Sequence, residues 1–250
     1  MYKNYILIFL AVLCIQCNSD SNSDDDPVVE AIRLLKTYEV TGSSNYKVQL
    51  FYNDDKTLDY ALSVSSEFEN FIHKFIYEDG KLVRSEIRDE NNIFQNNYVE
   101  YTYINDQIFE RRDLYDNAVL DETYRFFTSS NRIDRIEYYA QENPELRNEF
   151  SFVYDMLGNV TSETDTNFTG VDYEFQYSYD NKTNPFKHIN PYFILWEDFP
   201  SRINNPTKIV RFNITDNTIE KTTDYTYIYD ERGYPTQQSD GTDTVRFTYY

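Results

Sequence analysis

Apolar and polar residues alternate along most of this chain, and aromatic rings dominate the apolar positions. Between residues 71 and 77, and again between residues 173 and 179, an aromatic side chain occupies every second position. A period of two is that of a β-strand, because successive side chains point to opposite faces of the sheet. We therefore predict strands with one aromatic face and one polar face.

These strands recur about every 25 residues, and each ends in an aromatic residue that we call the anchor. After most anchors a turn containing Asp, Asn or Gly is followed by an apolar residue, as at Gly80 before Leu82 and Gly233 before Tyr234. Such turns are typical of β-hairpins. The predicted anchors are Tyr52, Tyr77, Tyr103, Phe127, Tyr154, Tyr179 and Tyr229.

Seven anchors predict an all-β fold, a long antiparallel meander of about 14 strands. Twisted open sheets rarely exceed about 10 strands without curling or splitting. We therefore expect a strongly curved sheet or a soluble barrel, with the aromatic face inside. Return strands such as residues 81 to 88 carry charged side chains at odd and at even positions, and therefore on both faces of the strand. This argues against a barrel that spans a membrane, which needs one apolar face on every strand.

The repeat is interrupted by residues 184 to 206, which hold four of the seven prolines and the only tryptophan. The prolines exclude a central strand, whereas the spacing of the apolar residues is compatible with one short helix over residues 191 to 199. The segment is either a cap over an open end of the aromatic face or a binding loop. In the second interpretation the candidate ligand-binding residues are Trp196, Tyr192 and His188.

The N-terminus has the features of an export signal. Residues 1 to 16 combine Lys3 with an apolar stretch that is too short to span a bilayer. Cys17 follows, and residues 17 to 29 read as an acidic, disordered tether before a single domain at residues 30 to 250. This arrangement resembles a bacterial lipoprotein signal, and the Ser/Asn/Asp tract after Cys17 resembles the signal of Bacteroidota lipoproteins. The resemblance implies lipidation of Cys17 and display on the outer membrane.

Residues 154 to 158 and 229 to 233 share the pattern Tyr-Asp-x-x-Gly. The pattern resembles the YD repeats of large bacterial shell and toxin-delivery proteins. More closely, residues 30 to 250 resemble an uncharacterised group of β-meander lipoproteins of Bacteroidota that is described as porin-like. The resemblance implies a fold and no assigned activity.

Charge and residue usage restrict the possible chemistry. With 43 acidic and 23 basic residues the net charge is −20, so the chain should repel nucleic acid. Only two histidines are present: His73, predicted to be a core histidine, and His188. We found no phosphate-binding loop or calcium-loop pattern, and Cys17 would be the one cysteine left after signal removal. We therefore predict no cofactor, no metal and no catalytic residues.

The function predicted from these features is that of a non-enzymatic surface lipoprotein, held at the membrane by its lipid anchor. It would bind a glycan or an envelope protein, or act as a structural interaction module. Two alternatives stay open. One is a polysaccharide hydrolase with a pair of carboxylates, which the sequence does not single out from 43 acidic residues. The other is a plug or assembly partner of an outer-membrane channel.

Overall fold

A computed structural model describes residues 32–67, 69–116, 119–130, 132–140, 143–167, 172–189 and 203–250. Residues Arg33–Tyr250 form one compact unit. All regular secondary structure in the described residues is β-strand. Within this described part, no helix is long and apolar enough to cross a membrane. The predicted helix over residues 191 to 199 lies outside the described residues.

The described residues form 17 strands in one sheet. Their bounds are β1 Leu35–Thr41, β2 Tyr46–Tyr52, β3 Leu58–Ser65, β4 Phe71–Glu78, β5 Lys81–Asp89, β6 Phe94–Ile104, β7 Gln107–Tyr115, β8 Val119–Ser129, β9 Arg132–Ala140, β10 Asn143–Tyr154, β11 Val160–Asn167, β12 Asp172–Thr183, β13 Asn204–Asn213, β14 Thr218–Asp224, β15 Thr226–Tyr229, β16 Pro235–Ser239 and β17 Thr244–Tyr249.

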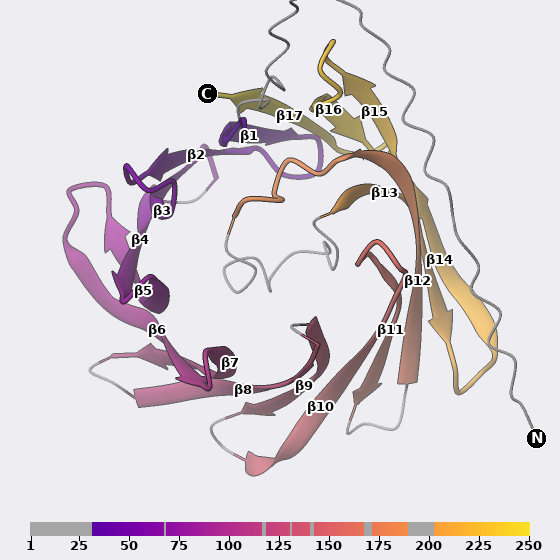
Figure 1. Cartoon of the computed structure of the whole chain (residues 1–250), viewed down its shortest axis with the longest axis horizontal. Helices are drawn as coiled ribbons and strands as arrows, with labels where there is room; N and C mark the ends of the chain where they lie inside the picture. Colours follow the sequence, from indigo (N-terminus) through magenta and orange to yellow (C-terminus); the bar gives the residue numbers. More distant parts are fainter. Residues whose placement is uncertain are drawn as a thin grey trace, which may run out of the picture. The chain divides into compact units, whose positions relative to one another are not determined.

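Each strand from β1 to β13 pairs antiparallel with the strand that follows it, β15 pairs antiparallel with β16, and β16 pairs antiparallel with β17. The last strand, β17, also pairs with β1, which closes the sheet into a barrel-like ring (Figure 1). Strands β14 and β15 are two parts of one strand separated by Tyr225, whose N–H donates to the Thr207 carbonyl. The predicted antiparallel meander is confirmed. Its seven anchored hairpins account for 14 strands, and β1, β14 and β17 are additional.

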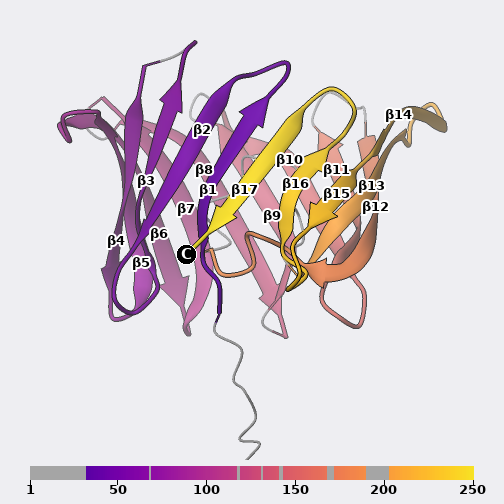
Figure 2. The same cartoon turned by 90° about the horizontal axis from the view of Figure 1, so that it is seen from above.

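The meander gives the barrel two distinct ends, visible in Figure 2. We call the end at which Arg33 leads into β1 the base, and the β2–β3, β4–β5 and β6–β7 turns lie there too. The opposite end, which carries the β1–β2 and β3–β4 connections, is the rim. The connection from β12 to β13 starts at the base, and its residues 184 to 189 turn into the barrel (Figure 1).

A β-bulge recurs in each anchored hairpin. The ladder shifts by one residue next to each anchor, because the return strand carries an extra residue, such as Val83 between Leu82 and Arg84. The anchor itself pairs with the residue before the bulge, so Tyr77 pairs with Leu82 and Tyr103 pairs with Ile108. Both partners are buried, with 1% and 2% of their surface exposed.

Two sequence-based assignments in this repeat are wrong by one residue. The fourth anchor is Thr128, which pairs with Ile133, and Phe127 points outward against Arg135. With Thr128 in place the first six anchors follow one another at steps of 25 or 26 residues. The residue paired with Tyr229 is the buried Pro235 rather than Tyr234, since the ladder resumes one position later.

Tyrosine phenols link successive hairpins. The hydroxyl of Tyr103 donates to the carbonyl of Leu82 at 2.9 Å, and that of Tyr154 donates to the carbonyl of Ile133 at 2.6 Å. In each case the acceptor is the residue that pairs with the preceding anchor. A buried phenol needs a hydrogen-bond partner, so this contact explains why tyrosine rather than phenylalanine prevails at the anchors. Equivalent bonds join Tyr52 to Leu35, Tyr179 to Val160, Tyr227 to Pro206 and Tyr249 to Pro235.

The two Tyr-Asp-x-x-Gly sequences form the same turn. The Oδ1 atom of Asp155 accepts the N–H of Leu157 at 2.8 Å and that of Asn159 at 2.9 Å. Asp230 binds the corresponding N–H groups in the second copy. Gly158 and Gly233 have φ values of 96° and 79°, a region that glycine enters without steric cost. The turn is therefore specified by its aspartate and its glycine.

Candidate functional site

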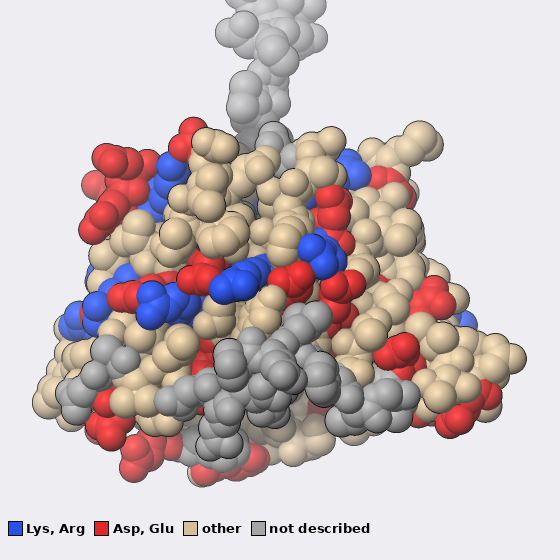
Figure 3. All heavy atoms as spheres, turned by 90° about the horizontal axis from the view of Figure 1, so that it is seen from below, with Lys and Arg blue, Asp and Glu red and all other residues tan. Residues whose placement is uncertain are grey.

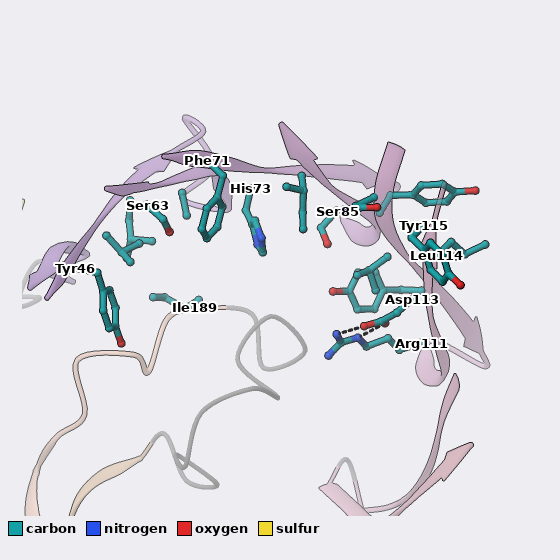
Figure 4. Close-up of a pocket in the computed structure, with 18 of the residues that line it drawn as sticks. Tyr46, Ser63, Phe71, His73, Ser85, Arg111, Asp113, Leu114, Tyr115 and Ile189 are labelled. Carbon is teal, nitrogen blue, oxygen red and sulfur yellow. Dashed lines mark hydrogen bonds and ion pairs between the residues drawn. The ribbon is translucent and has the colours of Figure 1, made fainter. Parts of the chain in front are cut away.

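The barrel interior contains a cavity of about 450 Å³, bounded by the inner faces of strands β1 to β8 and by residues of the 184 to 189 segment (Figure 4). Barrels with many more than about eight strands are too wide for their own side chains to fill. A volume of this size lies in the range typical of small-molecule sites, about 300 to 1,000 Å³. The cavity is thus a candidate binding site that the fold itself creates.

The cavity opens at the rim. Phe71 and Tyr115 line it where β4 begins and β7 ends, and they are 36% and 39% exposed. Exposed Glu69, in the β3–β4 connection at the rim, also lines it. At the inner end, buried Phe186 and Ile189 form part of the wall. The opening therefore faces away from the base, where the chain enters β1.

The segment 184 to 189 is fixed by aromatic contacts. The ring of Phe186 meets those of Tyr38 and Phe247 edge to face, with centroids 5.5 and 6.1 Å apart. This packing favours the cap interpretation for the described part of the proline-rich interruption.

Buried asparagines hold both ends of this interruption on the barrel wall. Asn159 Nδ2 donates to Asn204 Oδ1 at 3.0 Å, and the Asn204 N–H donates to Asn159 Oδ1 at 3.1 Å. Asn184 Nδ2 donates to the Asn204 carbonyl at 3.2 Å. Asp180 Oδ1 accepts the N–H of Asn205, which is fully buried. These hydrogen bonds specify one conformation of the chain where it leaves the repeat.

An ion pair lies in the cavity wall. Arg111 donates from Nε and Nη2 to the two carboxylate oxygens of Asp113, at 2.8 and 2.6 Å, and its side chain is only 4% exposed (Figure 4). The bidentate geometry satisfies both charges. Burial raises the pKa of the Asp113 carboxyl, and the Arg111 charge opposes that effect. Tyr101 pairs with Arg111 in the β6–β7 ladder.

A second carboxylate on this inner wall, Glu122, pairs with Asp113 across the β7–β8 ladder. It accepts hydrogen bonds from the hydroxyls of Tyr124, at 2.7 Å, and Tyr138, at 2.8 Å. Burial and the Glu122 carboxylate raise the pKa of Tyr124, so this phenol stays protonated and donates. Both carboxylates are therefore engaged as hydrogen-bond acceptors.

His73 faces the cavity from β4 (Figure 4). Its ring contacts those of Phe71 and Phe75, with centroids 5.3 and 6.4 Å away. Burial, and secondarily the charge of Arg111, lower the pKa of His73 to about 4. The imidazole is thus neutral at pH 7, in line with the core role predicted for it.

The lowered pKa of His73 makes the free energy of unfolding depend on pH. Above the unfolded pKa of about 6.5 the imidazole is neutral in both states, whereas below it only the unfolded chain takes up a proton. The free energy of unfolding should therefore fall by up to about 3 kcal/mol between pH 6.5 and pH 4 because of His73 alone. Urea unfolding at pH 7 and pH 4.5 should show a smaller acid loss for His73→Gln than for the native chain. Burial and the charges of Lys187 and Lys56 also lower the pKa of the exposed His188, so His188→Gln is the comparison and should reduce the acid loss less than His73→Gln does. Equal acid losses in all three chains would contradict the assignment.

The candidate residues that the sequence analysis proposed do not lie together in one site. His188 is exposed, beside buried Ile189, and does not line the cavity. Trp196, Tyr192 and Cys17 lie outside the described residues, so their roles stay predictions. In the described part of the chain no cluster of His, Cys, Asp or Glu has a geometry suited to a metal. The sequence did not single out Arg111 and Asp113.

Comparison with known proteins supports the fold. No family model and no curated protein matches the chain. A porin-like protein from Bacteroides uniformis ATCC 8492 is similar in structure, with a TM-score of 0.57 and 14% identity, over 86% of this chain and 98% of that one. A porin-like protein from Bacteroides vulgatus ATCC 8482 gives a TM-score of 0.55 and 14% identity over 88% and 99% of the two chains. The predicted porin-like β-meander is thereby confirmed as a fold.

Proposed function

We propose that this chain is a lipid-anchored surface protein that binds a small ligand inside its barrel. The observation that carries the proposal is the direction of the cavity, which opens at the rim while the chain enters at the base through Arg33. A protein held to a membrane through residues that precede Arg33 would keep its base on the membrane side. The opening of the cavity would then be accessible from the medium.

The outer wall of the barrel carries charged side chains, as expected of a surface in contact with water. Figure 3 shows a belt of alternating basic and acidic side chains across one outer face. Outward pairs on β6 to β10 include Arg125 with Glu110 at 3.4 Å and Arg135 with Glu149 at 2.8 Å. A wall in contact with lipid would need an apolar band about 25 Å tall instead. The ion pairs therefore favour a barrel that is tethered to the membrane and surrounded by water.

The anchor in this proposal is Cys17, as the lipoprotein-like signal implies. Stable attachment takes more than one acyl chain, since each buried methylene contributes only about 0.8 kcal/mol. The acidic residues after Cys17 would be repelled by anionic headgroups, which suits a tether that holds the barrel away from the bilayer.

Replacing the proposed lipidated residue tests the anchor. In Cys17→Ser cells the protein should move from the membrane fraction to the soluble fraction of the envelope or the medium, because no thiol remains to accept an acyl chain. Immunoblots of fractionated cells give the readout, and Ser19→Ala is a control that leaves the cysteine in place. Retention of Cys17→Ser in membranes to the level of the native chain would refute lipid anchoring.

The hydrolase alternative has less support from the cavity wall. A glycosidase needs one carboxyl group free to donate a proton and a second free to attack or to activate water. Asp113 is bound at both oxygens by Arg111, and Glu122 accepts two phenols. The arrangement suits binding better than proton transfer. A role as plug or assembly partner of an outer-membrane channel stays a prediction.

A further inference from the structure

We infer that the cavity takes an uncharged amphipathic molecule, with its apolar body against the β2–β3 wall and the 184 to 189 segment and its hydrogen-bonding group near Ser85 and the Arg111–Asp113 pair. The inference rests on the proposed function only in treating the cavity as the binding site. It does not depend on the lipid anchor.

The inner wall accounts for the apolar part of the ligand. Val48, Leu50 and Ala61 on β2 and β3 are 4%, 0% and 2% exposed, and each lines the cavity. Phe186 and Ile189, from the 184 to 189 segment, also line the cavity. Apolar surface of this kind gains from contact with a ligand that displaces water. Pockets for small molecules typically have such a lining with a few placed polar groups.

The polar groups are few and lie on the adjoining strands. Ser63, His73 and Ser85 project into the cavity from β3, β4 and β5 (Figure 4). A serine hydroxyl can both donate and accept, and a neutral imidazole does the same through its two nitrogens. These groups fit a hydroxyl, ether or amide function of a ligand.

The distribution of charge excludes an anion. Arg111 is the one Lys or Arg among the described residues that line the cavity, and Asp113 neutralises it. His73 is neutral at pH 7, because its pKa is about 4. The carboxylates Glu69 and Asp121 line the rim side. An anionic ligand would thus meet negative charge on its way in and would find no unpaired cation inside.

Two dyes with the same aromatic body test this selectivity. N-phenyl-1-naphthylamine is uncharged, and 1-anilinonaphthalene-8-sulfonate carries a sulfonate. The full chain with Cys17→Ser, purified without detergent, should bind the uncharged dye saturably at one site and at least about tenfold more tightly than the anionic dye, a difference of about 1.4 kcal/mol. Fluorescence titration at pH 7 measures both constants.

A matched pair of substitutions on β3 locates the site. Ser63→Phe puts a ring into the cavity, whereas Val64→Phe adds the same ring at the next position, which is 41% exposed and does not line the cavity. The first change should weaken binding of the uncharged dye by more than about tenfold, and the second should leave it unchanged. Circular dichroism confirms that both chains keep their strands. Equal binding by the two folded variants would overturn the site.

Asp113→Asn tests the origin of the selectivity. It keeps the shape of the side chain but leaves the Arg111 charge uncompensated, so the anionic dye should gain affinity relative to the uncharged one. If this variant loses its strands, the ratio of the dissociation constants of the two dyes, measured on the Cys17→Ser chain, tests the selectivity instead. Absence of saturable binding of the uncharged dye, or equal affinity for both dyes, would overturn the inference. Neither result bears on membrane release by Cys17→Ser, so the two proposals fail separately.

Discussion

Arg111→Met should lower the free energy of unfolding by about 3 to 5 kcal/mol, the usual cost of removing one partner of a buried ion pair. The Asp113 carboxylate would remain in the inner wall without the two N–H donors that lie at 2.8 and 2.6 Å. Burial already raises the pKa of this carboxyl, so its charge depends on the guanidinium. Urea denaturation followed by circular dichroism measures the loss.

The next residue along β7 provides a matched control. Arg112 points to the outer face, is 42% exposed and lies 3.9 Å from Glu100, which is 40% exposed. Surface pairs of this kind contribute about 0 to 1 kcal/mol, so Arg112→Met should change stability little. The double change Arg111→Met with Asp113→Leu should recover most of the loss, since both charges are then gone. Equal losses for Arg111→Met and Arg112→Met would contradict the assignment of Arg111 to the interior.

Leu82→Ala should cost about 2 to 5 kcal/mol, the range for truncation of a fully buried leucine. Leu82 is 1% exposed, pairs with the anchor Tyr77, and its carbonyl accepts the phenol of Tyr103 at 2.9 Å. A cavity at this position would therefore loosen the contact between two successive hairpins. The same urea titration gives the measurement.

The bulge residue beside it is the comparison. Val83 is the extra residue of the return strand and is partly exposed. Val83→Ala should cost about 1 kcal/mol, which is near the average for a single substitution. Losses of the same size at positions 82 and 83 would show that the bulge does not set the buried face of the hairpin.

The architecture follows from the sequence because its signals are local and repeated. Alternation with period two defines the strands, and each Asp or Gly turn defines a hairpin, so the antiparallel meander can be predicted without long-range information. The fourth anchor shows the limit. Phe127 is aromatic and Thr128 is not, yet the ladder puts Thr128 in the anchor position. A single sequence does not reveal which residue a bulge skips.

The cavity wall was missed for the same reason. Ile108 faces inward, so simple alternation along β7 would direct Glu110 and Arg112 inward and Arg111 outward. The bulge at Phe109 adds one residue to β7 and so exchanges the two faces for the residues that follow. It brings Arg111 and Asp113 to the inner face. The bulge is a feature of strand pairing that a single sequence does not reveal, so the inward direction of Arg111 and Asp113 could not be predicted from it. The cavity itself depends on closure between β1 and β17, which no local pattern specifies.

Accessibility of the rim in living cells tests most directly whether the barrel displays its cavity at the cell surface. The mature native chain would have no cysteine other than the lipidated Cys17. A single introduced cysteine would therefore carry the one thiol that a maleimide can label. Glu69→Cys places that thiol at the exposed rim of the cavity, and Leu50→Cys, at a position that is 0% exposed, is the control. We expect a membrane-impermeant maleimide to label Glu69→Cys on intact cells and to leave Leu50→Cys unlabelled. Labelling of Glu69→Cys only after cell lysis would contradict surface display.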